Sequence, residues 1–126
     1  MIVFRRARKA HLRLGRHGEN AACRLLRSYG WEILARNWRC YYGELDIVAR
    51  DGNTIVFIEV KTRRFRPDYR PADNLSLRQY RRNLRAANAY CREIHWDPGL
   101  RRCELIEVES SAWRLHTIRR RILPRL

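Results

Sequence analysis

A predicted β-hairpin between Gly43 and Arg63 constrains the fold of this chain more than any other stretch. Its sequence is GELDIVARDGNTIVFIEVKTR. Apolar and polar residues alternate in the first half, Asp51-Gly52 supplies a tight turn, and the second half is a β-branched run, which together are typical of a hairpin. With the turn at the hairpin tip, we expect Ala49 to lie opposite Thr54.

This register would gather charged side chains on one face of the hairpin. The pairs that follow from it are Asp46 with Phe57, Glu44 with Glu59, and Tyr42 with Lys61. Directly paired residues point to the same face of a sheet, and so do residues two apart along one strand. We therefore expect Glu44, Asp46, Glu59 and Lys61 to project from one side.

Carboxylates that face each other across a strand pair repel, so this grouping costs stability unless a cation is bound. Mg²⁺ and Mn²⁺ take oxygen ligands, often one or two carboxylates together with substrate phosphates. A lysine beside them can orient a water or stabilise charge on a phosphate. The alternative interpretation is a solvated hairpin face with an ordinary acid–lysine pair. Among 28 Lys plus Arg, only Lys9 and Lys61 are lysines, which favours a specific role for Lys61.

Composition bounds the class of protein. With 126 residues and 45% hydrophobic content, the chain predicts one folded domain. Its formal net charge of +15 makes nucleic acid the default partner. No stretch approaches the ~18 consecutive apolar residues of a membrane span, and no signal peptide is evident, so we expect a cytoplasmic protein without a membrane partner. The four cysteines lack C-x-x-C spacing and predict free thiols, not a zinc site.

The hairpin segment resembles the signature of the YraN-type family, an uncharacterised bacterial protein family, and the resemblance covers roughly residues 14–108. Those proteins resemble the PD-(D/E)XK nuclease superfamily and, within it, archaeal Holliday-junction resolvases. The resemblance implies a restriction endonuclease-like α/β fold, whose mixed central sheet begins with an antiparallel meander and is flanked by two main helices. It also implies that Asp46, Glu59 and Lys61 occupy the nuclease-motif positions.

Residues Gly15 to Tyr29 predict a helix, within which Glu19 points along the core-facing side. One interpretation is a further acidic ligand for the hairpin site. The other is an ordinary helix N-terminal glutamate that interacts with free backbone amides. The pattern G-x-x-G-E-x-x-A, which begins at Gly15, is similar to the opening helix of that family and to the first acidic position of the resolvases, and this favours the site.

Arginines flank the hairpin site on two further segments. The predicted loop from Arg63 to Asn74 interleaves basic residues with Phe65 and Tyr69, so it is either a flap over a phosphate backbone or a plain linker. A helix is predicted from Leu75 to Ile94, with Asn74 or Ser76 as its N-cap and a basic outer face. The candidate nucleic-acid-binding residues are Arg63, Arg64, Arg66, Arg78, Arg82 and Arg85. Where the resembled family usually has a lysine, this chain has Gln79.

Three more strands complete the expected domain. They are predicted at Trp31–Trp38, Arg102–Glu109 and Ala112–Ile118. The domain organisation that follows is a basic N-terminal arm over residues 1–14, a single nuclease-like domain over 15–118, and a basic C-terminal tail over 119–126.

The leading functional prediction is a metal-dependent endonuclease that hydrolyses phosphodiester bonds, with branched DNA as a candidate substrate. Asp46, Glu59 and Glu19 would hold Mg²⁺ or Mn²⁺, and Lys61 would position water or stabilise charge on the phosphate. Glu44 and Gln79 are further candidates in that site. The alternative is a non-catalytic DNA- or RNA-binding accessory protein with the same fold, and a weaker third reading is a ribosome- or membrane-associated basic protein. DNA is favoured over RNA, and the resolvase-like relatives suggest a homodimer.

Overall fold

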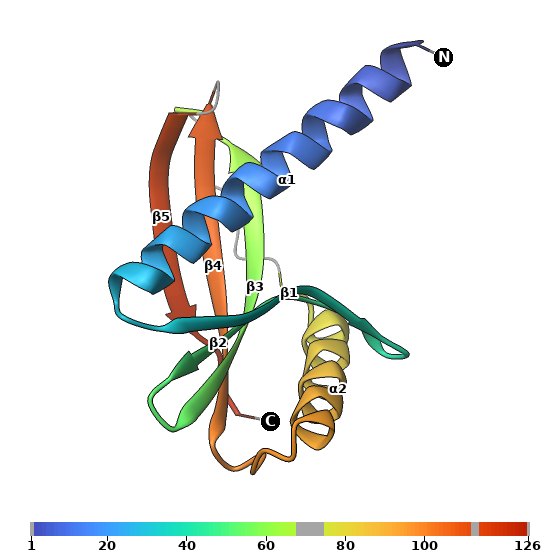
Figure 1. The fold of residues 1–126 in the computed structure, drawn as a ribbon. Helices are drawn as coiled ribbons and strands as arrows, with labels where there is room; N and C mark the ends of the chain where they lie inside the picture. The colour runs from blue at the N-terminus through green and yellow to red at the C-terminus, as the bar shows by residue number, and fades with distance from the viewer. Residues whose placement is uncertain (1, 68–74, 112–113, 126) are drawn as a thin grey trace.

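The computed structural model describes residues 2–67, 75–111 and 114–125, with side chains from Arg13 onward (Figure 1). Its elements in chain order are α1 (Ile2–Ser28), β1 (Glu32–Cys40), β2 (Gly43–Asp51), β3 (Thr54–Arg64), α2 (Leu77–Glu93), β4 (Arg101–Ser111) and β5 (Arg114–Ile122). The strands form one open sheet in sequence order. β3 and β4 are parallel, and the other neighbouring strands are antiparallel. The expected α/β class, with a mixed sheet that begins with an antiparallel meander, is confirmed.

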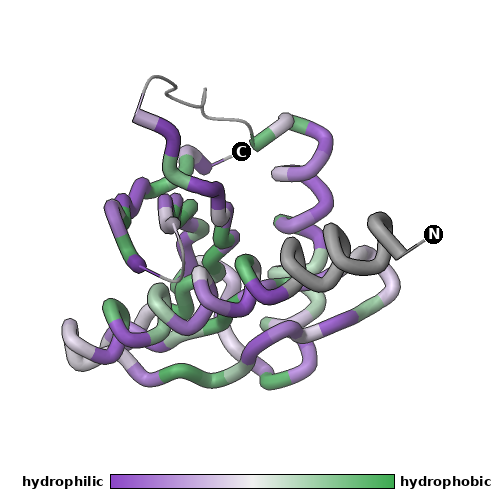
Figure 2. The backbone as a smooth tube through the Cα atoms, turned by 90° about the horizontal axis from the view of Figure 1, so that it is seen from above, coloured by the Kyte–Doolittle hydropathy of each residue, from purple (hydrophilic) through white to green (hydrophobic). Residues whose placement is uncertain are grey.

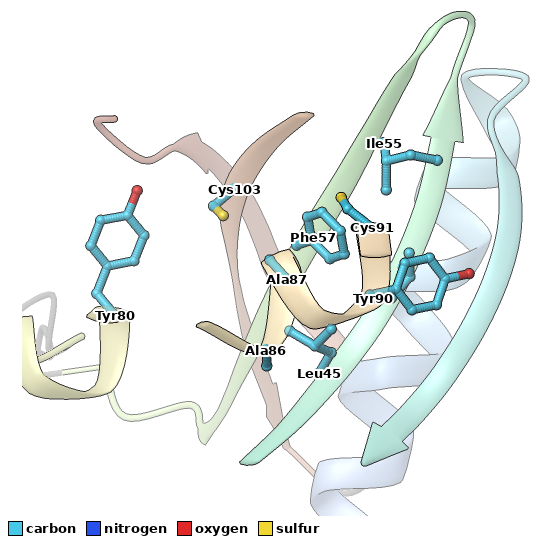
Figure 3. Close-up of a cluster of buried hydrophobic side chains, with 10 residues drawn as sticks. Leu45, Ile55, Phe57, Tyr80, Ala86, Ala87, Tyr90, Cys91 and Cys103 are labelled. Atoms are coloured by element: carbon cyan, nitrogen blue, oxygen red, sulfur yellow. The ribbon is translucent and has the colours of Figure 1, made fainter. Parts of the chain in front are cut away.

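The two helices cover opposite faces of the sheet. Successive residues of a strand point to opposite faces, and the two hydrophobic cores follow this alternation. Ala22 and Leu26 of α1 pack in one core with Val56 of β3. Phe57, the next residue, lies in the other core with Tyr90 of α2, and Figure 3 shows residues of that cluster. Figure 2 shows hydrophilic and hydrophobic stretches alternating along α2 and along the coloured part of α1, as expected of helices with one buried side.

The register between β2 and β3 differs by two residues from the predicted one. Asp51 pairs with Thr54 and Ile47 with Ile58, so that Gly52 and Asn53 alone form the turn. Gly52 has a φ of +60°, a conformation that glycine adopts without strain. The predicted pairs that are wrong are Ala49 with Thr54, Asp46 with Phe57, Glu44 with Glu59, and Tyr42 with Lys61. A shift of two residues does not change the face to which a side chain points, because the period of a strand is two.

Two elements extend furthest beyond their predicted bounds. α1 begins at Ile2 and not at Gly15, so most of the predicted basic arm has a helical backbone. β5 continues to Ile122, beyond the predicted end at Ile118. The extension pairs with β4, where Arg119 lies across from Glu107 and its guanidinium is 3.6 Å from Glu109. Within the described residues, no helix is both long and apolar enough to cross a membrane.

The start of α2 is fixed by Ser76. Its Oγ accepts a hydrogen bond from the backbone N–H of Gln79 at 3.1 Å, so the second of the two predicted N-caps is confirmed. The first, Asn74, lies outside the described residues. The same holds for Tyr69 of the predicted basic loop and for Ala112 of the predicted last strand.

A close contact fixes where α1 crosses the sheet. A Cβ added at Gly18 would lie 1.8 Å from Oγ1 of Thr62 on β3, so only glycine allows this approach. The contact determines the position of Glu19, the next residue, which faces β1.

A buried carboxylate joins β4 to β5 on the α1 face. Glu104 is 0% exposed, and its oxygens lie 2.7 Å from Nε of Arg102 and 2.9 Å from Nε of Arg120. Both guanidinium groups also lie over the ring of Trp31, at 5.0 and 5.1 Å from its centroid. Arg102 makes a further ion pair with Asp51 at 2.9 Å. Two cations thus neutralise a carboxylate that is fully removed from water, as a buried charge requires.

Candidate functional site

Asp46 lies where β2 separates from β3. The last residue pair of this ladder is Ile47 with Ile58. Just beyond it, Oδ2 of Asp46 accepts a hydrogen bond from the backbone N–H of Val60 at 2.8 Å. The side chain thus takes the place of a strand carbonyl, and turning it away would leave a strand amide without this acceptor. This hydrogen bond holds the carboxylate beside Glu59, the residue that precedes Val60.

Two amide side chains of α2 hold Glu59. Nε2 of Gln79 donates a hydrogen bond to Oε1 at 3.0 Å, and Nδ2 of Asn83 donates to Oε2 at 3.4 Å. Gln79 and Asn83 are four residues apart and therefore lie on one side of the helix. Because the Ser76 N-cap sets where the helix begins, it also sets the direction from which both amides reach the sheet.

Lys61 completes the cluster from the same strand as Glu59. It is two residues further along β3, so both side chains point to the α2 face. Its Nζ lies 3.6 Å from Oε1 of Glu59 and donates a hydrogen bond to Oε1 of Gln79 at 3.4 Å. The Lys61 side chain is 29% exposed, against 12% for Glu59. The ammonium group therefore lies at the edge of the cluster, within reach of water or a ligand.

The electrostatics of the cluster disfavour two negative charges. Burial and, next, the charge of Glu59 raise the pKa of Asp46 to about 7, although the hydrogen bond from the Val60 N–H opposes both effects. Burial also raises the pKa of Glu59, while Lys61 opposes that rise. Two carboxyl groups this close titrate as a pair, and the second ionisation is the costly one. A bound cation would remove that cost.

An open cavity of about 470 Å³ lies over the acidic pair. Its floor contains Asp46 and Glu59, and its rim carries the exposed arginines Arg78 and Arg82 of α2. The remaining lining residues are Gly43, Glu44, Ser76, Gln79 and Asn83. Negative groups at the bottom and positive groups at the edge suit a ligand in which a cation and an anion bind together.

A sequence model of the uncharacterised protein family UPF0102 matches residues 18–108, which include every residue of this cluster. The chain belongs to family UPF0102. The identification as a YraN-type protein is thereby confirmed.

Three UPF0102 relatives illustrate the similarity. The UPF0102 protein of Nocardia farcinica is 53% identical over 74 residues, which cover 59% of this chain and 58% of that protein. The UPF0102 protein STH1475 of Symbiobacterium thermophilum is 40% identical over 99 residues, or 79% of this chain and 84% of that one. The UPF0102 protein of Caldicellulosiruptor saccharolyticus is 40% identical over 95 residues, or 75% and 80%. The family is described as uncharacterised, so function has to be argued from the site.

Glu44 and Glu19 are the other two acids predicted for the site of this UPF0102 chain, and they differ in their position relative to the cavity. Glu44 lines the cavity and forms an ion pair with Arg39 at 3.5 Å. Glu19 does not line the cavity, and it instead lies 3.7 Å from Arg36 and accepts a hydrogen bond from Asn37 at 3.4 Å. Burial raises the pKa of Glu19, and the charge of Asp46 is the next largest cause. Glu19 is therefore electrostatically coupled to the pair, while its assignment as a direct ligand stays a prediction.

The arginines predicted to bind nucleic acid fall into two groups. Arg78 and Arg82 line the cavity, and the exposed Arg85 follows one turn later on α2. Arg63 and Arg64 lie at the end of β3, and Arg66 lines a separate cavity of about 480 Å³ with Phe65 and Arg119. The α2 group thus adjoins the acidic pair.

Sequence reasoning missed Asn83, which the structure places against Glu59. Its spacing of four residues from Gln79 was a signal that could have found it, because both residues then share one helix face.

The residues of the pair fit a hard divalent cation. Asp46 and Glu59 offer oxygen donors only, in a cavity with space for water and substrate oxygens, and Mg²⁺ is commonly bound by one or two carboxylates in this way. Among the residues for which side chains are described, no three His, Cys, Asp or Glu side chains lie close enough together to hold a metal ion. In this arrangement of side chains, water, substrate or backbone oxygens would complete the coordination, and Glu19 stays a predicted ligand.

Asp46→Asn should stabilise the metal-free protein at alkaline pH. The folded-state pKa of Asp46 is about 7, above the ordinary 3.8. The stability that this group contributes is present at low pH and is lost as the pH rises through 7. Asparagine does not ionise and can still accept the Val60 hydrogen bond. We expect the free energy of unfolding to match wild type near pH 4 and to exceed it by roughly 1–3 kcal/mol above pH 7.

Urea denaturation in EDTA across this pH range measures the effect. Glu93→Gln, which removes a carboxylate from an exposed position on α2, is the control. An Asp46→Asn variant that is less stable than wild type at every pH would contradict the raised pKa.

Proposed function

We propose that this protein is a nucleic-acid-binding, metal-dependent nuclease that hydrolyses phosphodiester bonds. The observation that carries the proposal is the convergence of Asp46 and Glu59 at one cavity with Arg78 and Arg82 on its rim. The ammonium group of Lys61 lies 3.6 Å from Glu59. A carboxylate pair that favours a bound cation, next to an ammonium group and two guanidinium groups, matches the charges of a metal ion and a phosphodiester.

The metal would be Mg²⁺ or Mn²⁺, held by Asp46 and Glu59. Such an ion lowers the pKa of a bound water and neutralises charge on the scissile phosphate. Gln79 and Asn83 would keep Glu59 in its orientation through the hydrogen bonds described above. Lys61 would orient the attacking water or donate to a phosphate oxygen as negative charge develops there.

The arginines would bind the phosphate backbone on either side of the cleaved bond. Arg78 and Arg82 are exposed, and they line the cavity from the helix that also holds Glu59. Contacts of this kind carry little sequence information, so affinity should fall steeply with salt concentration. The net charge of +15 supports the same class of partner.

Three predictions from the sequence belong to this proposal. DNA is favoured over RNA, and the protein would act as a homodimer, because the chain resembles Holliday-junction resolvases. It would act in the cytoplasm, as expected from the sequence.

A second candidate function is a non-catalytic accessory protein that binds DNA or RNA. The observation that favours it is the position of Gln79, which hydrogen-bonds to both Glu59 and Lys61. An amide that engages both groups takes up part of the hydrogen-bonding capacity of the ammonium group, and the resembled family usually has a lysine at this position.

Cleavage assays distinguish the two functions. Wild type, Lys61→Ala, Glu59→Ala and a control, Arg24→Ala on the exposed side of α1, are incubated with single-stranded, duplex and four-way-junction DNA and with RNA. Mg²⁺, Mn²⁺ and EDTA are compared. We expect cleavage only with metal, a rate about 10²- to 10⁴-fold lower in Lys61→Ala, and no change in the control. Binding without cleavage in either metal would instead support the accessory function, and cleavage that persists in both Lys61→Ala and Glu59→Ala would come from a contaminant.

A further inference from the structure

The turn between β1 and β2 exposes two adjacent tyrosines. Tyr41 is 97% exposed and Tyr42 is 38% exposed. Their rings meet edge to face, with centroids 5.5 Å apart. Figure 1 shows that this turn extends beyond α2, at the far end of the hairpin from the β2–β3 turn. A ring as exposed as that of Tyr41 gains almost nothing from burial, so the fold itself does not explain its presence.

The turn is held next to the acidic cavity. Gly43 follows the two tyrosines, has a φ of +142° and lines the cavity. A Cβ at Gly43 would lie 3.4 Å from Cδ of Arg82, so the backbone of the turn packs closely on that side chain. Tyr42 and Tyr41 therefore lie one and two residues from the cavity wall at Gly43.

Guanidinium groups accompany the rings. The Arg39 side chain, on the β1 side of the turn, is 80% exposed, and Arg82 lies exposed on the α2 side. Exposed aromatic rings interleaved with arginines are the combination that binds single nucleic-acid strands, because the rings stack on bases while the cations bind phosphates. A protein partner would need a much larger complementary surface than two rings provide.

We propose that Tyr41 and Tyr42 form a stacking platform for unpaired nucleobases. The substrate class is then nucleic acid with unpaired bases next to the cleaved bond, such as a single strand or a branch point, and not an uninterrupted duplex. Bases within a duplex are already stacked on their neighbours and offer no free face to a ring. This inference rests on the proposed function, because the rings reach only a strand whose phosphates lie at the cavity.

Binding measurements in EDTA test the platform without cleavage. Fluorescence anisotropy is measured with a single strand, an uninterrupted duplex of the same sequence, and a duplex with a central branch. The proteins are wild type, a Tyr41→Leu, Tyr42→Leu variant and a Tyr41→Phe, Tyr42→Phe variant. Leucine keeps an apolar side chain and removes the ring, whereas phenylalanine keeps the ring. The leucine variant should bind the single strand and the branch at least about fivefold more weakly and the duplex equally well, and the phenylalanine variant should match wild type.

A second readout reports stacking directly. 2-Aminopurine at the unpaired position loses fluorescence when it stacks, so wild type and the phenylalanine variant should quench it and the leucine variant should not. Circular dichroism melts check that both variants fold.

These measurements distinguish a failure of the stacking platform from a failure of the proposed function. Leucine substitutions that leave all affinities unchanged, or that weaken duplex binding as much as single-strand binding, overturn the platform and leave the acidic site to its own cleavage test. A wild-type protein that binds none of the probes overturns both the platform and the proposed function.

Discussion

Glu59→Gln is expected to slow metal-dependent cleavage of nucleic acid by about a thousandfold while leaving the protein folded. The substitution removes one of the two negative charges on the cavity floor and keeps the size of the side chain. It also keeps an oxygen that can accept a hydrogen bond from Gln79 or Asn83. The loss should therefore be confined to metal binding and to the chemistry that depends on it.

Cleavage kinetics and a thermal shift with Mn²⁺ measure the two effects separately. At pH 8, Mn²⁺ should raise the melting temperature of wild type and leave that of Glu59→Gln unchanged. Glu93→Gln, an isosteric change at an exposed acid on α2, is the matched control and should behave as wild type in both measurements. Cleavage by Glu59→Gln at the wild-type rate would show that the reaction does not use this carboxylate.

Glu104→Gln should have the opposite pattern, with a large loss of stability and normal cleavage by the folded protein. Glu104 is fully buried and neutralises Arg102 and Arg120. Its removal leaves two partly buried guanidinium groups without this carboxylate, and breaking a buried ion pair costs about 3–5 kcal/mol. The cleavage rate per folded molecule should not change, because Glu104 pairs with Ile58 and faces α1, whereas the acidic cavity lies on the α2 face.

Urea denaturation measures this loss, and the exposed Glu32 of β1 provides the control through Glu32→Gln, which should stay close to wild type. A loss below about 1 kcal/mol would mean that water hydrates the two guanidinium groups once the carboxylate is replaced, as it does at exposed ion pairs. If Glu104→Gln lowered cleavage without lowering stability, the two faces of the sheet would not be independent.

The faces of the central hairpin could be predicted from the sequence, although its register could not. Side chains of a strand alternate between the two faces with a period of two, so an error of two residues in the register leaves each side chain on the predicted face. Asp46, Glu59 and Lys61 therefore share a face despite the wrong pair assignments. The register depends on which two residues form the turn. The dipeptide Asp51-Gly52 predicted a turn one residue earlier than the observed turn at Gly52 and Asn53.

The contacts that complete the site depend on tertiary structure. The hydrogen bond from Val60 to Asp46 exists because the β2–β3 ladder ends at Ile47, and no local pattern marks that end. The position of Glu19 follows from the close approach of Gly18 to Thr62, residues 44 positions apart in the chain. Likewise β5 continues past its predicted end because its arginines meet the glutamates of β4, which are close only in the folded sheet.

The hydrogen bond between Asp46 and Val60 has a mechanical consequence. It is the attachment from which the β1–β2 arm departs, and the same arm ends in the exposed tyrosine pair. A ligand that drew the Asp46 carboxylate away from the Val60 amide would therefore weaken the attachment of β2 to β3 at the base of the segment that carries these tyrosines.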